Sequence, residues 1–394
     1  MSLRALLVAV MVVPAIVGAV RGAVPEAGAA VDGNGERPAQ TAGAAPDHRG
    51  GAGTAFTVTT LTDELDMPWS FAFMPDGDIL VTERGGTVQR LDPDSGRLAP
   101  IAGVPEVFYE GQGGLLDIAL SPDFPDTGWV YLTYSAPMGE GRSTTRLARA
   151  RLEGDALRDI EVLYTTGPAQ DTRKHYGGRL LFSDGHLFMT MGERGQRELS
   201  QRLDTDLGKV LRFNTDGSIP ADNPFAATPG ARAAIFTYGH RNPQGLDRHP
   251  RTGEIWITEH GPQGGDELNR LRPGANYGWP VITYGEEYGG GKIGEGVAKP
   301  GMEQPVYYYV PSIASSALAF YHGAAFPAWD GDAFIGALRG MHLNRLSFAA
   351  DGQVSEQRLL SDLTPRLRDV KQGPDGFLYL LSEQGSLLRL TPED

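Results

Sequence analysis

Cysteine is absent from this chain of 394 residues. Its absence excludes disulfides, thiolate metal sites, cysteine nucleophiles and lipid attachment through an N-terminal cysteine. Export stays compatible with the sequence, because an exported protein can fold without disulfides. Long helical periodicity is also nearly absent. The apolar run at residues 5–20 is short for a membrane span, so no stable span is expected in the processed protein.

Positive charge is scarce. The chain has 35 Lys and Arg against 49 Asp and Glu, which gives a net charge of −14. An acidic chain is a poor candidate for binding nucleic acid or anionic membranes. Neutral small molecules, and cations held by local carboxylates, are better-suited partners. The 53 glycines and 28 prolines follow no collagen period, and they indicate the turn-rich structure of an all-β protein.

The N-terminal residues have the order of a secretory signal peptide. A short basic start, 1-MSLR-4, precedes the apolar run, and the small residues 27-AGA-29 follow it. We therefore predict a signal peptide over residues 1–29 and an exported protein, secreted or periplasmic. A retained anchor is the alternative. Residues 30–54 have almost nothing to bury, so we predict a disordered linker.

One pattern returns six times in the rest of the chain. An apolar strand leads through a Pro/Asp/Gly or Ser/Asp/Gly turn to a second strand, and a third short strand follows. The copies lie at residues 69–91, 115–135, 178–195, 243–262, 316–340 and 368–390. This repetition predicts a six-bladed β-propeller over residues 55–394. A β-sandwich is the alternative, but it would not repeat one hairpin signature six times.

In a propeller we expect the long inter-blade loops to carry the functional site. The longest non-repeating stretches are 136–177, 196–240 and 263–315. Near the first of these, 174-KHYGGRL-180 places His175 before a strand, and neutral histidine can accept a proton near pH 7. An ordinary loop histidine is the alternative.

Two segments offer guanidinium groups. The turn 239-GHRNPQG-245 contains Arg241 and Asn242, which suit a carboxylate or a developing oxyanion, although Asn before Pro also simply starts turns. In 365-PRLRD-369, Arg366 and Arg368 point to one side of an extended chain. Because two guanidinium groups repel each other, this arrangement suggests that an anion with several negative charges binds between them. A surface pair bonded to Asp362 or Asp369 is the alternative. Arg339 is a further candidate.

The segment 258-TEHGPQGGDELNRLRPGANYGWP-280 is rich in glycine and carboxylates. Carboxylates and backbone carbonyls in a loop suit Ca²⁺, a hard cation with flexible geometry. The spacing is not that of an EF-hand, however, and taken alone the segment is better explained as a connecting loop.

Together these segments resemble the soluble pyrroloquinoline quinone (PQQ)-dependent aldose sugar dehydrogenases of the glucose/sorbosone dehydrogenase family. The resemblance covers roughly residues 60–391 in family order, and the family fold is a six-bladed propeller. The matching stretches are 111-GQGGLLDIALSPDF-124, 175-HYGGRL-180, 208-GKVLRFNTDGSIPADNPF-225, 238-YGHRNPQGL-246, 259-EHGPQGGDELN-269, 275-ANYGWP-280 and 366-RLRDV-370.

The resemblance implies a role for each matching residue. His175 corresponds to the general base that takes the proton of the anomeric hydroxyl, and Arg241 lies near the reactive carbonyl of the cofactor. Cofactor contacts are implied for Gln112, Arg241, Asn242, Arg366, Arg368 and, by a looser match, Arg339.

The resemblance also implies two calcium ions. Gly261 and Pro262 would offer backbone oxygens to a Ca²⁺ at the quinone. Glu267 and Tyr277, the latter through its carbonyl, would bind a second, structural Ca²⁺.

Two departures bear on specificity. Lys174 stands where glucose-specific relatives have an Asp, and Glu193 stands where relatives carry an Asp toward the substrate. We therefore expect oxidation of a broad range of aldoses, mono- and disaccharides, at C1 to the lactone, with an electron acceptor that the residues do not specify. The alternatives are a non-catalytic propeller that binds sugar or protein, and a PQQ-dependent sorbosone or alcohol dehydrogenase.

Overall fold

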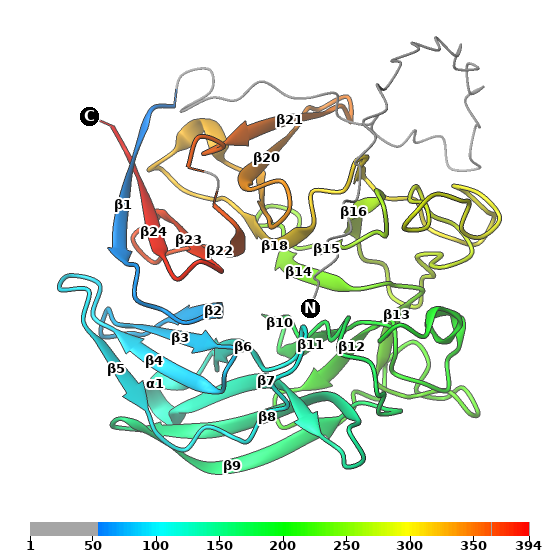
Figure 1. The fold of residues 1–394 in the computed structure, drawn as a ribbon, viewed down its shortest axis with the longest axis horizontal. Helices are drawn as coiled ribbons and strands as arrows, with labels where there is room; N and C mark the ends of the chain where they lie inside the picture. The colour runs from blue at the N-terminus through cyan, green and yellow to red at the C-terminus, as the bar shows by residue number, and fades with distance from the viewer. Residues whose placement is uncertain (1–53, 364, 394) are drawn as a thin grey trace, which may run out of the picture. The chain divides into compact units, whose positions relative to one another are not determined.

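The computed structural model describes residues 54–363 and 365–393, which form six four-stranded antiparallel sheets. Figure 1 shows these sheets arranged around a common centre. The six-bladed β-propeller predicted from the repeats is thereby confirmed. The predicted signal peptide and residues 30–53 of the predicted linker lie outside the described residues.

The first three blades follow one another along the chain. The first contains β2 (Pro68–Phe73), β3 (Ile79–Glu83), β4 (Thr87–Leu91) and β5 (Leu98–Ile101). The second contains β6 (Leu115–Leu120), β7 (Trp129–Pro137), β8 (Ser143–Glu153) and β9 (Ala156–Thr165). The third contains β10 (Leu180–Ser183), β11 (His186–Met191), β12 (Lys209–Asn214) and β13 (Ile235–Tyr238).

The next two blades repeat the order, and the last is built from both ends of the described chain. The fourth contains β14 (Pro243–Arg248), β15 (Ile255–Glu259), β16 (Asp266–Arg270) and β17 (Tyr307–Tyr309). The fifth contains β18 (Ser315–Phe320), β19 (Ala333–Ala337), β20 (His342–Phe348) and β21 (Val354–Leu359). The sixth contains β22 (Leu367–Gln372), β23 (Leu378–Ser382), β24 (Leu387–Pro392) and β1 (Phe56–Thr62).

Strand β1 closes the ring. It runs antiparallel to β24, with Phe56 opposite Pro392 and Thr60 opposite Leu388. Figure 1 shows β1 in blue beside the red C-terminal strands. Because the outer strand of the sixth blade comes from the other end of the chain, separating the ends would expose the edge of a sheet.

The fourth strand of each blade was not predicted, and half of the loop expected at 136–177 is in fact strand, formed by β8 and β9. These outer strands lack the apolar pattern on which the prediction rested. In β9, residues 158–162 are all exposed. This strand lies at the outer edge of its sheet, where fewer neighbouring side chains pack against it. Turn chemistry located the inner hairpins better: Gly77, at the tip of the first one, has a φ of 97°.

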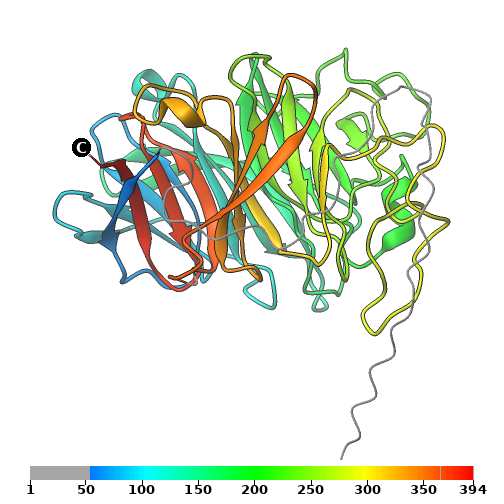
Figure 2. The ribbon, with the colours of Figure 1, turned by 90° about the horizontal axis from the view of Figure 1, so that it is seen from above.

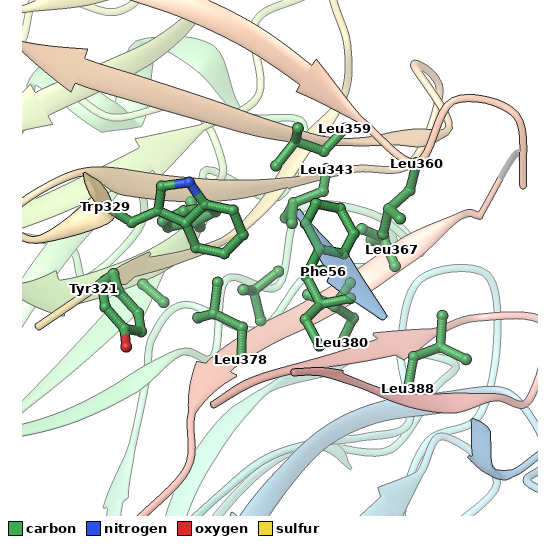
Figure 3. Packing of buried hydrophobic residues seen from close by; sticks show 14 of the residues in the cluster. Phe56, Tyr321, Trp329, Leu343, Leu359, Leu360, Leu367, Leu378, Leu380 and Leu388 are labelled. Atoms are coloured by element: carbon green, nitrogen blue, oxygen red, sulfur yellow. The ribbon is translucent and has the colours of Figure 1, made fainter. Parts of the chain in front are cut away.

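The hydrophobic core is divided into clusters that lie between neighbouring blades. Between the fifth and sixth blades, Trp329, Leu343 and Leu367 pack with Phe56 and Leu380, as Figure 3 shows. Comparable clusters lie at the other five blade contacts. Figure 2 shows the same ring from its edge, with the blades standing side by side. Each blade is therefore stabilised mainly by its two neighbours.

The innermost strands of the blades, β2, β6, β10, β14, β18 and β22, contact their neighbours around the ring. Short helical turns occur in the connections: α1 (Phe124–Thr127), η1 (Arg197–Gln201) and η2 (Pro327–Trp329). None of the helices in the described part of the chain has the length and apolar character needed to cross a bilayer.

Candidate active site

A cavity of about 410 Å³ opens where the innermost strands begin, and all six blades line it. Each blade contributes a residue at or just before the start of its innermost strand: Trp69, Leu116, Gly177, Asn242, Ala314 and Arg368. A second set comes from the turns that follow the second strands: Arg84, His260, Leu338, Arg339 and Glu383. In an antiparallel blade these two positions share one end of the sheet, so the topology brings them together.

His175 lies just before β10, next to the cavity-lining residues Tyr176 and Gly177. Its backbone is held in the left-handed region, with a φ of 58°, and its N–H donates to Gln112 Oε1 at 2.7 Å. Gln112 lines the cavity as well. The structure thus places two of the predicted site residues in direct contact.

The imidazole of His175 is oriented by Glu193, whose Oε1 lies 2.5 Å from Nδ1. Both side chains are buried. Because a carboxylate is an acceptor, Nδ1 carries the proton and Nε2 is left with the lone pair. One carboxylate oxygen of Glu193 is therefore directed at the histidine.

Burial is the main influence on the protonation of His175. It lowers the pKa of the imidazole, and the positive charge of Arg241 lowers it further, while the hydrogen bond to Glu193 acts in the opposite direction. The net result is a pKa below the ordinary 6.5, so the ring is neutral at pH 7. A neutral histidine with a free Nε2 can accept a proton.

Gly192 allows this arrangement. A Cβ at position 192 would lie 2.2 Å from the carbonyl oxygen of His175 and 2.7 Å from Asn242 Oδ1. Any other residue there would push the histidine segment away from Glu193, so the close approach of the two loops requires glycine.

Arg241 and Asn242 form the start of the fourth blade. The backbone N–H of Arg241 donates to Glu259 Oε2 at 2.7 Å, and its Nη1 donates to the carbonyl of His260 at 3.0 Å. The guanidinium also lies 5.4 Å from the ring centre of Trp279. Asn242 lines the cavity. The same turn contains His240, which bonds Glu259 and stacks on Tyr277, so this histidine supports the loop.

Arg366 and Arg368 point to one side of β22, as predicted, and they share one carboxylate. Arg366 Nη2 lies 2.8 Å from Glu383 Oε2, and Arg368 bonds the other oxygen of the same group. Burial acts to raise the pKa of Glu383, but the two guanidinium charges outweigh it and lower the pKa to about 2. Arg339 lies on the same side of the cavity, on an exposed turn.

Arg84 adds a positive charge to the site that was not predicted from the sequence. It lines the cavity, is buried, and donates to the carbonyl of Gly113 at 3.0 Å. Burial and the nearby Arg368 lower its pKa. Four guanidinium groups therefore surround a cavity whose lining contains one carboxylate, Glu383. This excess of positive charge suits a ligand with several carboxylates.

The floor of the cavity rests on a buried ionic network in the propeller centre. Arg179 lies 4.2 Å from the ring centre of Trp69 and donates from Nε to the carbonyl of Gln244. Its Nη1 is 2.9 Å from Asp369 and 3.6 Å from Asp117. This network joins the second, third and sixth blades below the site. Its members and Gln244 were not predicted, because nothing local distinguishes them from ordinary strand residues.

Of the residues predicted to bind metal, Gly261 and Pro262 lie in the hairpin between β15 and β16, Glu267 lies in β16, and Tyr277 lies in the loop that follows β16. Gly261 and Pro262 follow the cavity-lining His260, and the N–H of Gly261 donates to Asp266 Oδ1 at 2.9 Å. No hydrogen bond from the described residues reaches the carbonyl oxygens of Gly261, Pro262 or Tyr277. The side chain of Tyr277 is already engaged, because its hydroxyl donates to the carbonyl of Arg270.

Glu267 lies near a second carboxylate, Glu259. Burial and this neighbouring charge raise the pKa of Glu267. Asn269 Nδ2 donates to Glu267 Oε2 at 2.9 Å, while its own Oδ1 is buried without a hydrogen-bond partner. Within residues 54–363 and 365–393 no group of three His, Asp or Glu side chains has the arrangement of a metal site. A cation here would therefore depend on backbone oxygens.

Comparison with known proteins adds to this geometry. Residues 65–389 match the sequence model of the glucose/sorbosone dehydrogenases. An aldose sugar dehydrogenase (YliI) of Escherichia coli K12 is 43% identical over 345 residues, which cover 86% of this chain and 93% of the relative.

Two solved structures share the fold. The apo-form of the soluble aldose sugar dehydrogenase from Escherichia coli superposes with a TM-score of 0.83 at 42% identity, covering 86% of this chain and all of the other. The PQQ-bound aldose sugar dehydrogenase from Streptomyces coelicolor superposes with a TM-score of 0.71 at 31% identity, covering 86% and 99%.

Proposed function

Because the chain belongs to the glucose/sorbosone dehydrogenase family, and is thus an oxidoreductase, we propose that it oxidises aldose sugars at C1 to lactones with PQQ as its cofactor. The observation that supports this most is the position of the His175–Glu193 pair beside a cavity that four arginines line. A proton acceptor and a binding site for a polyanion are thereby adjacent.

The residues of the cavity fit PQQ, a planar compound with three carboxylates. Arg84, Arg339, Arg366 and Arg368 would hold the carboxylates, and Arg368 Nε is buried without a partner in the protein. When bound, PQQ would supply an ortho-quinone that accepts the hydride of the sugar, and this hydride carries both electrons of the oxidation.

The protein supplies the proton transfer and the orientation. His175 Nε2 takes the proton of the anomeric hydroxyl as the C1–H bond breaks, and Glu193 holds the ring and stabilises the imidazolium that forms. Arg241, fixed by its bonds to Glu259 and His260, would provide a positive charge for a carbonyl of the bound cofactor.

Calcium binding belongs to the same proposal. The carbonyl oxygens of Gly261 and Pro262, which accept no hydrogen bond from the described residues, suit a Ca²⁺ near the cavity. The ion would act as a Lewis acid and polarise a carbonyl of the ligand. A second, structural Ca²⁺ would be held by the carboxylate of Glu267 and the carbonyl of Tyr277. Glu267 is buried beside Glu259, and a bound cation would compensate the two neighbouring negative charges.

We also propose that the protein is exported, on the basis of the signal-like residues 1–29, and that its substrate range is broad. The broad range is supported by Lys174, which occupies the position of the sugar-reading Asp of glucose-specific relatives.

The test is reconstitution of the purified protein with PQQ and CaCl₂, followed by assay against a panel of mono- and disaccharides with a dye as electron acceptor. Aldose-dependent dye reduction is expected, and His175→Ala should remove most of it while PQQ binding persists. If no aldose is oxidised, the proposal is wrong, and turnover of sorbosone or an alcohol alone would assign the protein to another reaction of the family.

A further inference from the structure

Arg194 follows Glu193 in the chain, and its side chain is fully buried outside the cavity lining. A buried guanidinium is usually paired with a carboxylate. Among the described residues, however, its four hydrogen bonds go to the carbonyl oxygens of Thr172, Lys174 and Ser143 and to the hydroxyl of Ser143. The guanidinium therefore holds backbone instead of neutralising a paired charge.

The partners of Arg194 lie on both sides of His175. Arg194 Nε donates at 2.9 Å to the carbonyl of Lys174, the residue before the histidine. The guanidinium lies 3.7 Å from the ring centre of Tyr176, the residue after it. In return, the hydroxyl of Thr172 donates to the carbonyl of Arg194 at 2.6 Å. One side chain thus fixes the whole segment in which the histidine lies.

The backbone of His175 needs such support. Its φ of 58° is unfavourable for a residue other than glycine, and such a conformation persists only where its surroundings hold it. Both polar groups of the peptide that precedes it are bound: the carbonyl by Arg194, and the N–H by Gln112 Oε1 at 2.7 Å. Together with the bond from Glu193 to Nδ1, these contacts determine where Nε2 points.

The charge of Arg194 also suits this place. Burial lowers the pKa of Arg194 to about 10, while Tyr176 and Glu193 act in the opposite direction, so the group is charged at pH 7. Glu193 is buried, and its Oε2 has no hydrogen-bond partner among the described residues. The nearby positive charge therefore favours the ionised carboxylate that the imidazole requires.

We propose that Arg194 is a positioning residue for the base: it fixes the peptide between Lys174 and His175, and thereby places Nε2 for the proton of the anomeric hydroxyl. This inference rests on the proposed function. The role requires the planar fork of a guanidinium, because the single ammonium of lysine cannot reach the same three carbonyl oxygens.

Two substitutions separate the fork from the charge. Arg194→Lys keeps the charge and loses the fork, whereas Arg194→Met loses both. Arg173→Met is the matched control, because Arg173 lies in the same loop and its guanidinium pairs at the surface with Glu110. Each variant of the full chain would be reconstituted with PQQ and CaCl₂ for steady-state kinetics, and the apo form would be titrated with PQQ.

We expect kcat to fall about tenfold or more in Arg194→Lys and further in Arg194→Met, because a small displacement of the base slows proton transfer. The Kd for PQQ should change less than about threefold, since the arginines proposed to hold its carboxylates lie in other blades. Arg173→Met should retain the wild-type kcat. A wild-type kcat in Arg194→Met would overturn the inference.

A double substitution distinguishes positioning from a general loss of structure. If Arg194 acts through the imidazole, Arg194→Lys should have no further effect on the residual rate of His175→Ala. The same fold-loss in both backgrounds would mean that Arg194 supports the fold only, and would overturn the inference. If Arg194→Met does not fold, Arg194→Lys decides alone.

A second measurement does not depend on activity. The proton between His175 Nδ1 and Glu193 should give a low-field NMR resonance in the apo protein, identified by its loss in His175→Ala. We expect this resonance to shift or disappear in Arg194→Lys and to persist in Arg173→Met. If the wild type oxidises no aldose, the proposed function fails, and the resonance then decides the inference: an unchanged signal in Arg194→Lys would refute it.

Discussion

His175 Nδ1 lies 2.5 Å from Glu193 Oε1, although the two residues come from different segments that flank the inner hairpin of the third blade. Their contact leaves Nε2 as the basic atom. It also makes Glu193 a positioning residue, because the carboxylate acts on the reaction through the ring that it holds.

Replacing Glu193 tests this relationship. In Glu193→Gln we expect kcat to fall by about 100-fold, because the amide can stabilise neither the correct tautomer nor the imidazolium. The Kd for PQQ should change less than threefold, and Glu193→Asp should recover part of the lost rate. Steady-state kinetics and PQQ titration measure both quantities, and a wild-type kcat in Glu193→Gln would refute the assignment.

The pH profile follows from the lowered pKa of His175. The base must be neutral, so kcat/KM should fall as the pH drops through that pKa, with a midpoint below the ordinary 6.5. Since the hydrogen bond to Glu193 raises this pKa, Glu193→Gln should move the acid limb to still lower pH. A midpoint at or above 6.5 in the wild-type profile would contradict the burial that the structure shows.

Glu383 should make the apo protein sensitive to acid. Its folded-state pKa is depressed to about 2 from 4.5, so its contribution to stability is present above pH 4.5 and is lost as the pH falls toward 2. The shift corresponds to about 3 kcal/mol. The melting temperature of Glu383→Gln should be lower than that of wild type at pH 7, and the gap should narrow between pH 4.5 and 3. A gap that does not depend on pH would show that the charge of Glu383 is not its source.

Calcium should stabilise the end of the fourth blade where Glu267, in β16, and the loop that carries Tyr277 lie. We expect CaCl₂ to raise the melting temperature of the apo protein relative to EDTA, because a bound ion stabilises only the folded state. Glu267→Gln should lose most of this increase. Glu254→Gln removes a carboxylate from the same blade, one that pairs with Arg270 at the surface, and should retain the increase. Equal calcium effects in the two variants would argue against a structural ion at Glu267.

The ionic network under the cavity should be essential for stability. Arg179→Met leaves Asp117 and Asp369 buried, with Lys371 as the remaining cation near them among the described residues, and breaking a buried pair costs about 3–5 kcal/mol. The urea midpoint should fall accordingly. Arg202→Met breaks an exposed pair with Asp204 and should cost less than about 1 kcal/mol. Similar midpoints for the two variants would mean that the network contributes no more than a surface pair.

The sequence alone determined the six blades, because each inner hairpin depends on local turn chemistry and on apolar strands a few residues away. It also placed Arg366 and Arg368 on one side of a strand, since alternation along an extended chain is a local property. Their partner was not predictable in the same way. The structure shows Glu383, from the turn after the next strand, where the sequence suggested Asp362 or Asp369.

Only the tertiary structure decided the rest of the site. Arg84 and Glu383 lie in turns whose local sequence carries no mark of function, and they meet the other site residues because ring closure brings the same end of every blade to one cavity. The sequence showed that a glutamate stands at position 193, but it did not show what its side chain contacts. Because residue 192 is glycine, the His175 segment can approach closely, and the carboxylate of Glu193 reaches the imidazole. Short-range patterns determine strands and turns, whereas the chemistry of the site depends on contacts between blades that are far apart in the chain.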